Sequence, residues 1–220
     1  MVKRSKARRL SDTWTGPLEK RILPKMAKAL PRTVVPDHLT FLGIIATLII
    51  GIGYVLVWFS KAWLLLCNFG LILHWFGDSL DGTLARVRKV EREKYGYFVD
   101  HICDAFSTVV ICIGIGVSPL MHIESALLLA LGYLLLNVYT HISAYTDNVF
   151  RISFLKLGPT EVRIMLIVFN TILIFWNPRI IKFETESLSI VDLGAILFFA
   201  IFCIVFIWNS VTMAIHLDKI

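Results

Sequence analysis

The chain has 220 residues, of which 57% are hydrophobic, and its mean hydropathy is +0.74. This composition excludes an ordinary soluble domain and favours a polytopic membrane protein. The formal net charge is +6, but the positions of the basic residues along the chain are more informative than their total.

The N-terminal region, residues 1–38, is polar, basic and rich in proline. We expect it to form a cytoplasmic region ahead of one transmembrane domain at residues 39–220. Residues 1–10 form a basic arm suited to a solvated tail beside an anionic lipid surface. Residues 18–30 place most of their apolar side chains on one side of a helix and their lysines and arginines elsewhere. This pattern predicts an amphipathic helix in the membrane interface, with Pro24 inside it.

The segment VVPDHLTFLG introduces the first apolar span. Pro36 suits the first turn of a helix, because its missing N–H would have no helical partner there. Asp37 follows, and we predict that its carboxylate caps the helix.

Six apolar segments follow, each near the roughly 20 residues that a helix needs to cross a bilayer core. They cover residues 39–59, 63–85, 97–117, 122–145, 160–177 and 190–216. Most lysines and arginines fall before the first span, in the loop 86–94, between 151 and 163, or at 219, whereas only Lys61, Arg179 and Lys182 lie on the alternate side. By the positive-inside rule, both termini and the loop 86–94 are cytoplasmic. The expected fold is all-α, with six transmembrane helices and an interfacial helix, in a cell membrane or endomembrane.

Glycine pairs occur within two of these spans. Gly51 and Gly53 lie in the first span, and Gly114 and Gly116 lie in the third. Small residues let helix backbones approach closely, so we expect helix contacts at these positions.

Four aspartates stand in the second and third spans at helical spacing. Asp78 and Asp81 are three residues apart, and Asp100 and Asp104 are four apart, so each pair projects from one helix face. Two such faces turned together form a four-carboxylate cluster. An ionised aspartate at mid-bilayer costs about 2.5–3.5 kcal/mol on insertion scales, so positive charge must compensate the cluster. Oxygen ligands favour Mg²⁺ or Mn²⁺, and four carboxylates suffice for two such ions.

Small residues beside the acidic pairs leave room for a ligand. Gly82 and Ala85 follow the first pair on roughly the same helix face, and Gly96 lies one turn before the second pair. Arg86, at the end of the second span, presents a planar guanidinium suited to a pyrophosphate or a base edge. A bulky anion is therefore the expected ligand.

These eight residues together match the signature D-x2-D-G-x2-A-R-x(8 or 9)-G-x3-D-x3-D at every fixed position. The chain therefore resembles the CDP-alcohol phosphotransferase family. The resemblance implies a membrane transferase of phospholipid biosynthesis that moves a substituted phosphate from a CDP-alcohol to the hydroxyl of a second alcohol and releases CMP. It implies two Mg²⁺ or Mn²⁺ ions held by Asp78, Asp81, Asp100 and Asp104, a lipid substrate from the bilayer, and a homodimer. No nucleic-acid partner is expected.

The start of the first span carries a second part of the resemblance. Family members often have P-N-x-L-T here, which Pro36, Leu39 and Thr40 match, whereas Asp37 stands at the Asn position. The residues that would border the nucleotide are then Thr40, Gly82, Ala85, Arg86 and Gly96.

The resemblance leaves the catalytic base open. The motif D-H-x-x-D at 100–104, with T-E-V at 160–162, is similar to the choline and ethanolamine phosphotransferase branch. In that branch His101 and Glu161 are candidates for a base relay, whereas other branches assign the base to Asp104. Glu161 also suits simple capping of a helix. The branch favours a CDP-aminoalcohol with diacylglycerol as substrates; the alternative is CDP-diacylglycerol with a polar alcohol such as glycerol phosphate or inositol phosphate.

Other basic and polar residues admit two interpretations. Arg151, Lys156 and Arg163 could bind an acceptor phosphate, or serve as ordinary positive-inside charges. His74, one turn before Asp78, could brace the acidic cluster or simply pack. A divalent-cation transporter could also bury four aspartates, but it would need a continuous polar path across the other helices. The intact motif argues against a degenerate scaffold.

Overall fold

The computed structural model describes residues 8–10, 13–147, 149–151, 158–176, 181–183 and 186–219. Within these ranges the chain is mainly helical, as the prediction of an all-α membrane protein requires. The helices are α1 (Gly16–Ala29), α2 (Pro36–Leu56), α3 (Leu64–Arg88), α4 (Glu93–Val117), α5 (Ile123–Asp147), α6 (Pro159–Phe175) and α7 (Ile190–Leu217). A short 3-10 helix, Lys61–Trp63, leads into α3.

Four strands of three residues each accompany the helices. β1 (Arg8–Leu10) pairs in parallel with β2 (Val149–Arg151), so that Arg8 is opposite Val149. β3 (Ile181–Phe183) pairs antiparallel with β4 (Glu186–Leu188). The sequence analysis predicts neither pair, because three residues carry too little alternation to indicate a strand.

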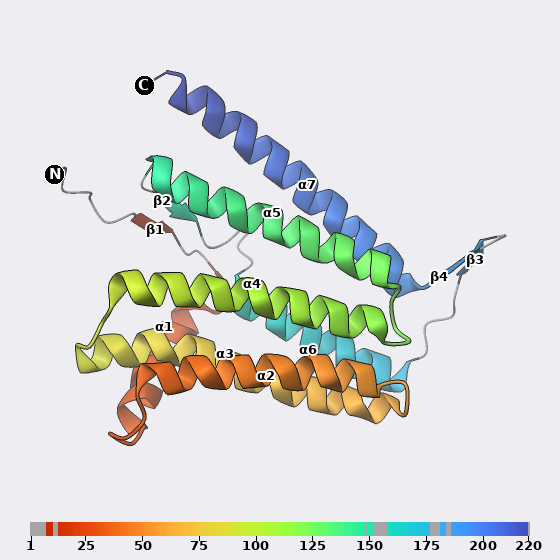
Figure 1. Ribbon diagram of the computed structural model, residues 1–220, viewed down its shortest axis with the longest axis horizontal. Coiled ribbons are helices and arrows are strands. Elements are labelled where there is room, and N and C mark those ends of the chain that lie inside the picture. Colours follow the sequence, from red (N-terminus) through yellow and green to blue (C-terminus); the bar gives the residue numbers. More distant parts are fainter. Residues whose placement is uncertain are drawn as a thin grey trace.

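Five helical segments of the described chain are long and apolar enough to cross a membrane. They are Pro36–Leu56, Lys61–Arg88, Glu93–Val117, Ile123–Thr146 and Ile190–Leu217. The remaining predicted span, 160–177, corresponds to α6, whose 17 residues make about 25 Å of helix and are fewer than in the other five. The helices α2 to α7 run in alternate directions along the long axis, and α6 keeps its place in this alternation (Figure 1).

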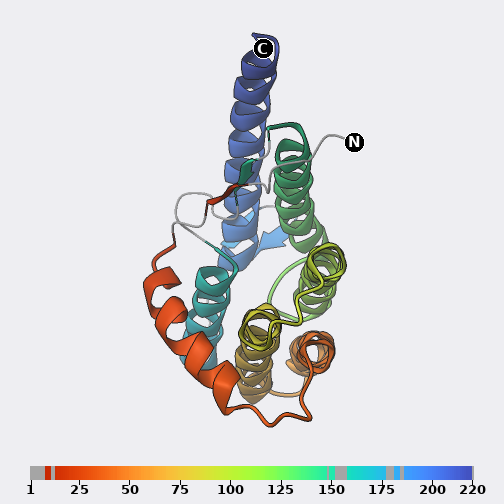
Figure 2. The same cartoon turned by 90° about the vertical axis from the view of Figure 1, so that its left-hand side faces the viewer.

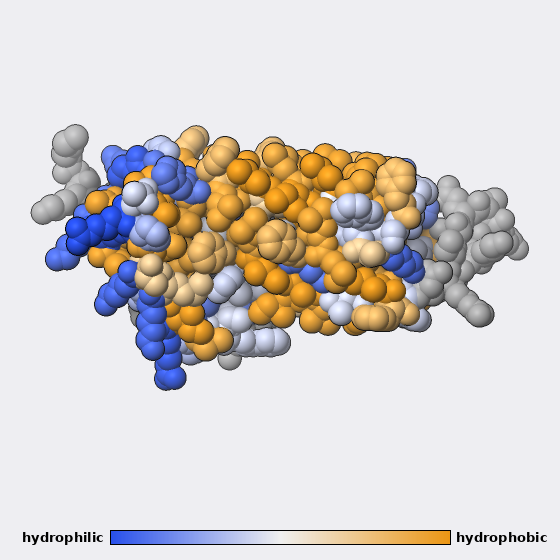
Figure 3. All heavy atoms as spheres, turned by 90° about the horizontal axis from the view of Figure 1, so that it is seen from below, coloured by the Kyte–Doolittle hydropathy of each residue, from blue (hydrophilic) through white to orange (hydrophobic). Residues whose placement is uncertain are grey.

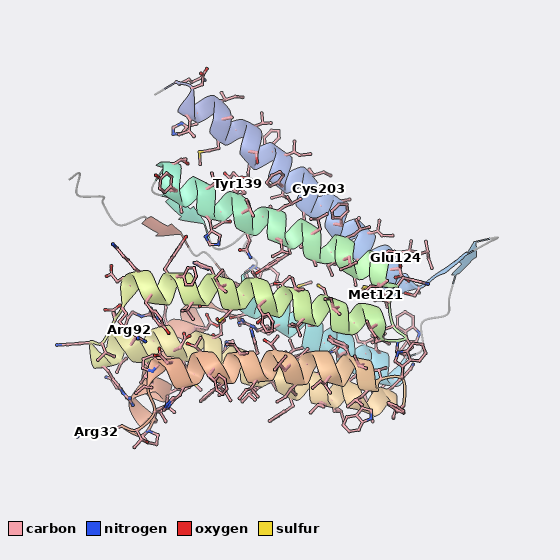
Figure 4. The ribbon with its side chains drawn as sticks, viewed as in Figure 1. Arg32, Arg92, Met121, Glu124, Tyr139 and Cys203 are labelled. Carbon is pink, nitrogen blue, oxygen red and sulfur yellow. The ribbon has the colours of Figure 1, made fainter. Side chains whose placement is uncertain are left out.

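The outer surface matches a bilayer environment. Apolar residues cover the middle of the face seen in Figure 3, and hydrophilic residues gather at the end that carries the turn between α3 and α4, hereafter the α3–α4 end. Phe69, Ile204 and Trp208 belong to a large set of apolar side chains that stay exposed on the helices. Arg32 and Arg92 lie at the α3–α4 end, whereas Met121 and Glu124 lie at the opposite end (Figure 4).

Helix α1 packs obliquely against the bundle at the α3–α4 end. Leu23 and Ala27 are buried in a small core with residues of α2 and α3, while Leu18 stays 59% exposed. Glu19 accepts hydrogen bonds from Trp75 Nε1 of α3 (3.0 Å) and Thr160 Oγ1 of α6 (2.7 Å). Seen from this end, α1 lies on the outside of the bundle, beside α3 and α6 (Figure 2). The predicted amphipathic helix is therefore present, with Pro24 inside it.

The helices α2, α3 and α4 approach closely at glycines. A Cβ added to Gly114 would lie 2.9 Å from the Cα and carbonyl oxygen of Gly51. This confirms the predicted helix contacts at these two glycines and shows that they join α2 to α4. A Cβ on Gly77 of α3 would lie only 2.6 Å from the carbonyl oxygen of Leu39 and 2.9 Å from the amide nitrogen of Gly43, both in α2. These contacts set the separation of the three helices that carry the acidic residues.

The start of α2 differs from the prediction at one residue. The helix begins at Pro36, as expected, but the capping position is Val35, and no side chain caps it. Asp37 lies one residue inside the helix and its carboxylate pairs with Arg92, just before α4. The prediction that Asp37 caps α2 is wrong, because the proline moves the helix start one residue earlier and directs this carboxylate to a neighbouring chain segment.

Candidate active site

The four aspartates of the motif line one small cavity between α2, α3 and α4. Asp78 and Asp81 come from α3, and Asp100 and Asp104 come from α4, as their helical spacing predicts. All four are only partly exposed. The remaining lining residues are Thr40, Gly43 and Ile44 of α2, His74 of α3, and Cys103 and Ser107 of α4.

Asp81 is held by α2 and by its own helix. The Thr40 hydroxyl donates to Asp81 Oδ2 at 2.8 Å, and the Gly82 amide donates to Asp81 Oδ1 at 2.5 Å. Thr40 therefore lies beside the acidic cluster, as its place in the family pattern implies. The close contact at Gly77 makes this bond possible, because it brings α2 to within reach of the α3 carboxylate.

Asp78 is paired with an arginine from outside the motif. The Arg163 guanidinium, from the first turns of α6, donates to Asp78 Oδ2 at 2.6 Å. The Arg163 side chain is 9% exposed and that of Asp78 is 23% exposed, so the pair is largely shielded from solvent. Such pairs keep their strength better than exposed ones, because little water screens them.

The carboxylates do not converge on one point. Among the described residues, no three His, Cys, Asp or Glu side chains come close enough together to hold a metal ion as they stand. Two contacts account for part of this spread, since Asp78 turns to Arg163 and Asp81 turns to Thr40. The cavity has the donor set that the motif predicts, and ligation by all four carboxylates requires their side chains to rotate.

A buried polar chain continues the cavity wall toward the bundle interior. The imidazole Nε2 of His74 lies 3.2 Å from Ser107 Oγ, which lies 2.7 Å from Thr47 Oγ1. His74 and Ser107 are 7% and 4% exposed. The histidine thus links α3 to α4 through a hydroxyl, and it contacts the aspartates only as a neighbour in the cavity wall.

The two glycines of the motif have open space around them. A Cβ built on Gly96 meets nothing within 4 Å, and one on Gly82 meets only the Arg86 guanidinium at 3.5 Å. Arg86 is exposed near the end of α3 and donates to Thr83 Oγ1 at 2.9 Å. Ala85 is partly buried beside it. Their roles toward a nucleotide stay predictions.

The two members of the predicted base relay lie in separate surroundings. Glu161 accepts hydrogen bonds from the amide and hydroxyl of Thr15 through Oε1, at 2.9 and 2.7 Å, and from the Gly158 amide through Oε2, at 2.9 Å. Glu161 therefore satisfies the backbone amide at the N-cap position of α6 and ties α6 to the start of α1. His101 instead packs against the rings of Tyr97 and His141, with ring centroids 4.3 and 4.4 Å away.

The candidate bases differ in their position relative to the cavity. Asp104 lines the cavity, whereas neither His101 nor Glu161 is among the described lining residues. The relay stays a prediction. Of the three residues proposed for an acceptor phosphate, Arg163 meets Asp78, and the side chains of Arg151 and Lys156 lie outside the described residues.

Several residues of the site are not singled out by the sequence analysis. The close contact of Gly77 with Gly43 and the polar pair Ser107 and Thr47 are the main examples. The seven-residue spacing of Gly70 and Gly77 is a signal of a packed helix face that could have indicated the first contact. No local pattern indicates that Arg163 pairs with a residue 85 positions earlier.

A known protein and a family model both match this chain. The chain is 28% identical to cholinephosphotransferase 1 of Bos taurus over 147 residues, which are 63% of this chain and 36% of that protein. The chain thus spans little more than a third of the length of this relative. The family model for CDP-alcohol phosphatidyltransferase matches residues 33–215, which include α2 to α6 and nearly all of α7. With the motif complete and its four aspartates around one cavity, the chain belongs to the CDP-alcohol phosphatidyltransferase family.

Proposed function

We propose that this protein is an integral-membrane transferase that moves a substituted phosphate from a CDP-alcohol to the hydroxyl of a second alcohol and releases CMP. The observation that carries the proposal is the arrangement of the motif: aspartates from two helices line one cavity between α2, α3 and α4. The favoured substrates are a CDP-aminoalcohol and diacylglycerol. The D-H-x-x-D sequence at 100–104 and the similarity to a cholinephosphotransferase support this choice.

The donor set fits a pair of hard divalent cations. The cavity offers four carboxylates and the hydroxyls of Thr40 and Ser107, all oxygen donors of the kind that Mg²⁺ and Mn²⁺ prefer. Asp78, Asp81, Asp100 and Asp104 would hold the ions. Bound there, two divalent cations would neutralise the diphosphate of the donor and stabilise CMP as it leaves.

Side chains of the protein would remove the proton from the acceptor and position the nucleotide. The acceptor hydroxyl attacks the β-phosphorus of the donor, so that a new O–P bond forms while the bond to the bridging oxygen breaks and CMP departs with that oxygen. Asp104 takes the hydroxyl proton, because it lines the cavity and a carboxylate can act as general base. Gly82 and Ala85 leave room for the nucleotide, and Arg86 is placed near the end of α3 to meet its phosphates.

We further propose that the cavity faces the cytoplasm and takes one substrate from the bilayer. The hydrophilic α3–α4 end, which carries Arg86, Arg88, Lys89 and Arg92, supports this orientation by the positive-inside rule. The exposed apolar side chains of the helices support lateral entry of a lipid from the surrounding bilayer. The proposed active form is a homodimer.

Release of CMP provides the test. Purified protein with Mg²⁺ would be incubated with CDP-choline, CDP-ethanolamine or CDP-diacylglycerol, each combined in turn with diacylglycerol, glycerol phosphate or inositol phosphate. We expect CMP from a CDP-aminoalcohol only when diacylglycerol is present. CMP from CDP-diacylglycerol with a polar alcohol would instead establish the alternative substrate pair. No CMP from any pair, with divalent-cation flux in liposomes lacking CDP-alcohols, would favour a transporter.

A further inference from the structure

The Arg163–Asp78 ion pair joins the acidic cavity to a helix outside the motif. Arg163 of α6 pairs with Asp78, one of the four aspartates of the cluster. Its N–O distance is 2.6 Å, and the arginine side chain is 9% exposed. A guanidinium stays protonated in proteins, so Arg163 brings a permanent positive charge to the edge of the cluster.

The position of Arg163 is fixed by the contacts at the start of α6. Glu161, two residues earlier, is bonded to Thr15 and to the Gly158 amide, and these bonds hold the first turn of α6 against α1. Helix α6 also packs along α3, the helix that carries Asp78. The ion pair is therefore part of the packed contact between α3 and α6 and does not lie on the open surface.

The pair places Arg163 in opposition to a divalent cation at Asp78. Asp78 Oδ2 accepts the guanidinium N–H, and the carboxylates of the cluster do not converge while this contact exists. A cation at the same carboxylate would also be repelled by the nearby guanidinium. We propose that Arg163 competes with divalent cations for Asp78 and thereby sets the metal affinity of the site. This inference rests on the proposed function, because it assumes that the cluster holds metal.

Metal affinity distinguishes competition from an orienting role. If Arg163 competes, Arg163→Gln removes the positive charge and the guanidinium donors and leaves a shorter, neutral side chain, so Mg²⁺ or Mn²⁺ should bind roughly tenfold more tightly. If Arg163 instead orients Asp78 for the metal, the same change should weaken binding. Arg163→Lys keeps the charge but loses the planar fork, so its affinity should lie between those of the wild type and Arg163→Gln.

Isothermal titration of the purified full chain with Mn²⁺ measures this affinity directly. Arg92→Gln is the matched control, because Arg92 also pairs with an aspartate, Asp37, but outside the cavity. The control should bind Mn²⁺ like the wild type. Unchanged or weaker binding by Arg163→Gln, or an equal gain in affinity for the control, would overturn the inference.

Thermal unfolding gives a second measurement that does not depend on the titration. With chelator present, Arg163→Gln should unfold at a lower temperature than the wild type, because the cluster loses its buried cation. Mn²⁺ should then raise its midpoint by more than it raises that of the wild type. An equal loss of stability with and without Mn²⁺ would mean that Arg163 is only a structural bridge, and the inference would fail.

The two proposals fail in different ways. If the wild type binds Mn²⁺ but no CDP-alcohol yields CMP, the proposed function is wrong while the competition can still be measured. If CMP is released and Arg163→Gln binds Mn²⁺ no more tightly, only the role of Arg163 is wrong. A wild-type chain that binds no divalent cation would overturn both.

Discussion

The aspartates of the cavity are chemically alike but have different hydrogen-bond partners. Asp81 is bonded to Thr40 and Asp78 to Arg163, whereas Asp104 lines the same cavity from the opposite helix. A group that accepts a proton during the reaction must be able to meet the substrate hydroxyl. This requirement separates Asp104 from Glu161, whose oxygens are both engaged at the start of α6.

Asp104→Asn should abolish transfer. The amide keeps the size of the side chain but can neither take a proton nor offer a full negative charge, so we expect CMP release to fall by at least about 10²-fold. The folded state should persist, as measured by thermal unfolding. Asp218→Asn makes the same chemical change at an exposed residue after α7 and should retain full activity.

His101→Gln provides the complementary comparison. We expect it to lower activity less than Asp104→Asn does, because His101 packs against Tyr97 and His141 instead of lining the cavity. Full activity in Asp104→Asn, together with loss in His101→Gln, would transfer the base role to the histidine.

At the scale of the helices, close backbone contacts decide whether the cavity exists. The bond from Thr40 to Asp81 spans α2 and α3, and Gly77 allows that approach beside the Leu39 carbonyl. The position of the cluster relative to α2 therefore depends on Gly77, which has no side chain and takes no part in the proposed reaction.

Gly77→Ala should reduce both stability and activity. Its Cβ would lie 2.6 Å from the Leu39 carbonyl oxygen, and because this is a backbone atom, α2 must move away. We expect a loss of about 1–3 kcal/mol in the free energy of unfolding and a lower rate of CMP release. Gly194→Ala is the matched control, since a Cβ there meets nothing within 4 Å. A Gly77→Ala protein with wild-type melting temperature and activity would contradict this account of the helix contact.

Much of the fold could be predicted from the sequence because helical periodicity is a local signal. The spacing of the aspartates places them on one face of each helix, and the apolar segments locate the spans. Contacts between helices are harder to predict from the sequence, because they join residues far apart in the chain. The sequence marks Gly51 and Gly114 as places of close helix contact, but it does not show that they contact each other. The pairing of Arg163 with Asp78 likewise depends on how α6 packs against α3. The ion pair between Asp37 and Arg92 is not predicted for the same reason, because the two residues are 55 positions apart in the sequence.

At the scale of the whole molecule, the acidic cluster lies inside a bundle of mainly apolar helices. Four carboxylates in partly buried positions repel one another, and this repulsion opposes folding unless positive charge offsets it. Arg163 supplies one such charge from α6. Divalent cations would supply the rest, so that folding stability and activity should respond together to their removal.

Removal of divalent cations should therefore stop CMP release and lower the thermal midpoint. Dialysis against EDTA is the treatment, and addition of Mg²⁺ or Mn²⁺ in excess should restore both quantities. Asp81→Asn should weaken the response of the midpoint to metal, because one ligand is lost. CMP release that continues at the full rate in EDTA would contradict a metal role for the cluster.

The alternating directions of α2 to α7 bring the first residue of α2 and the last residue of α7 to the same end of the bundle (Figure 1). In a sealed vesicle, fluorescent labels at His38 and His216, each replaced by cysteine in a chain without its native thiols, should share one compartment. A membrane-impermeant quencher added outside would then dim both labels or neither. Quenching of one label alone would mean that the chain crosses the bilayer an odd number of times between these positions.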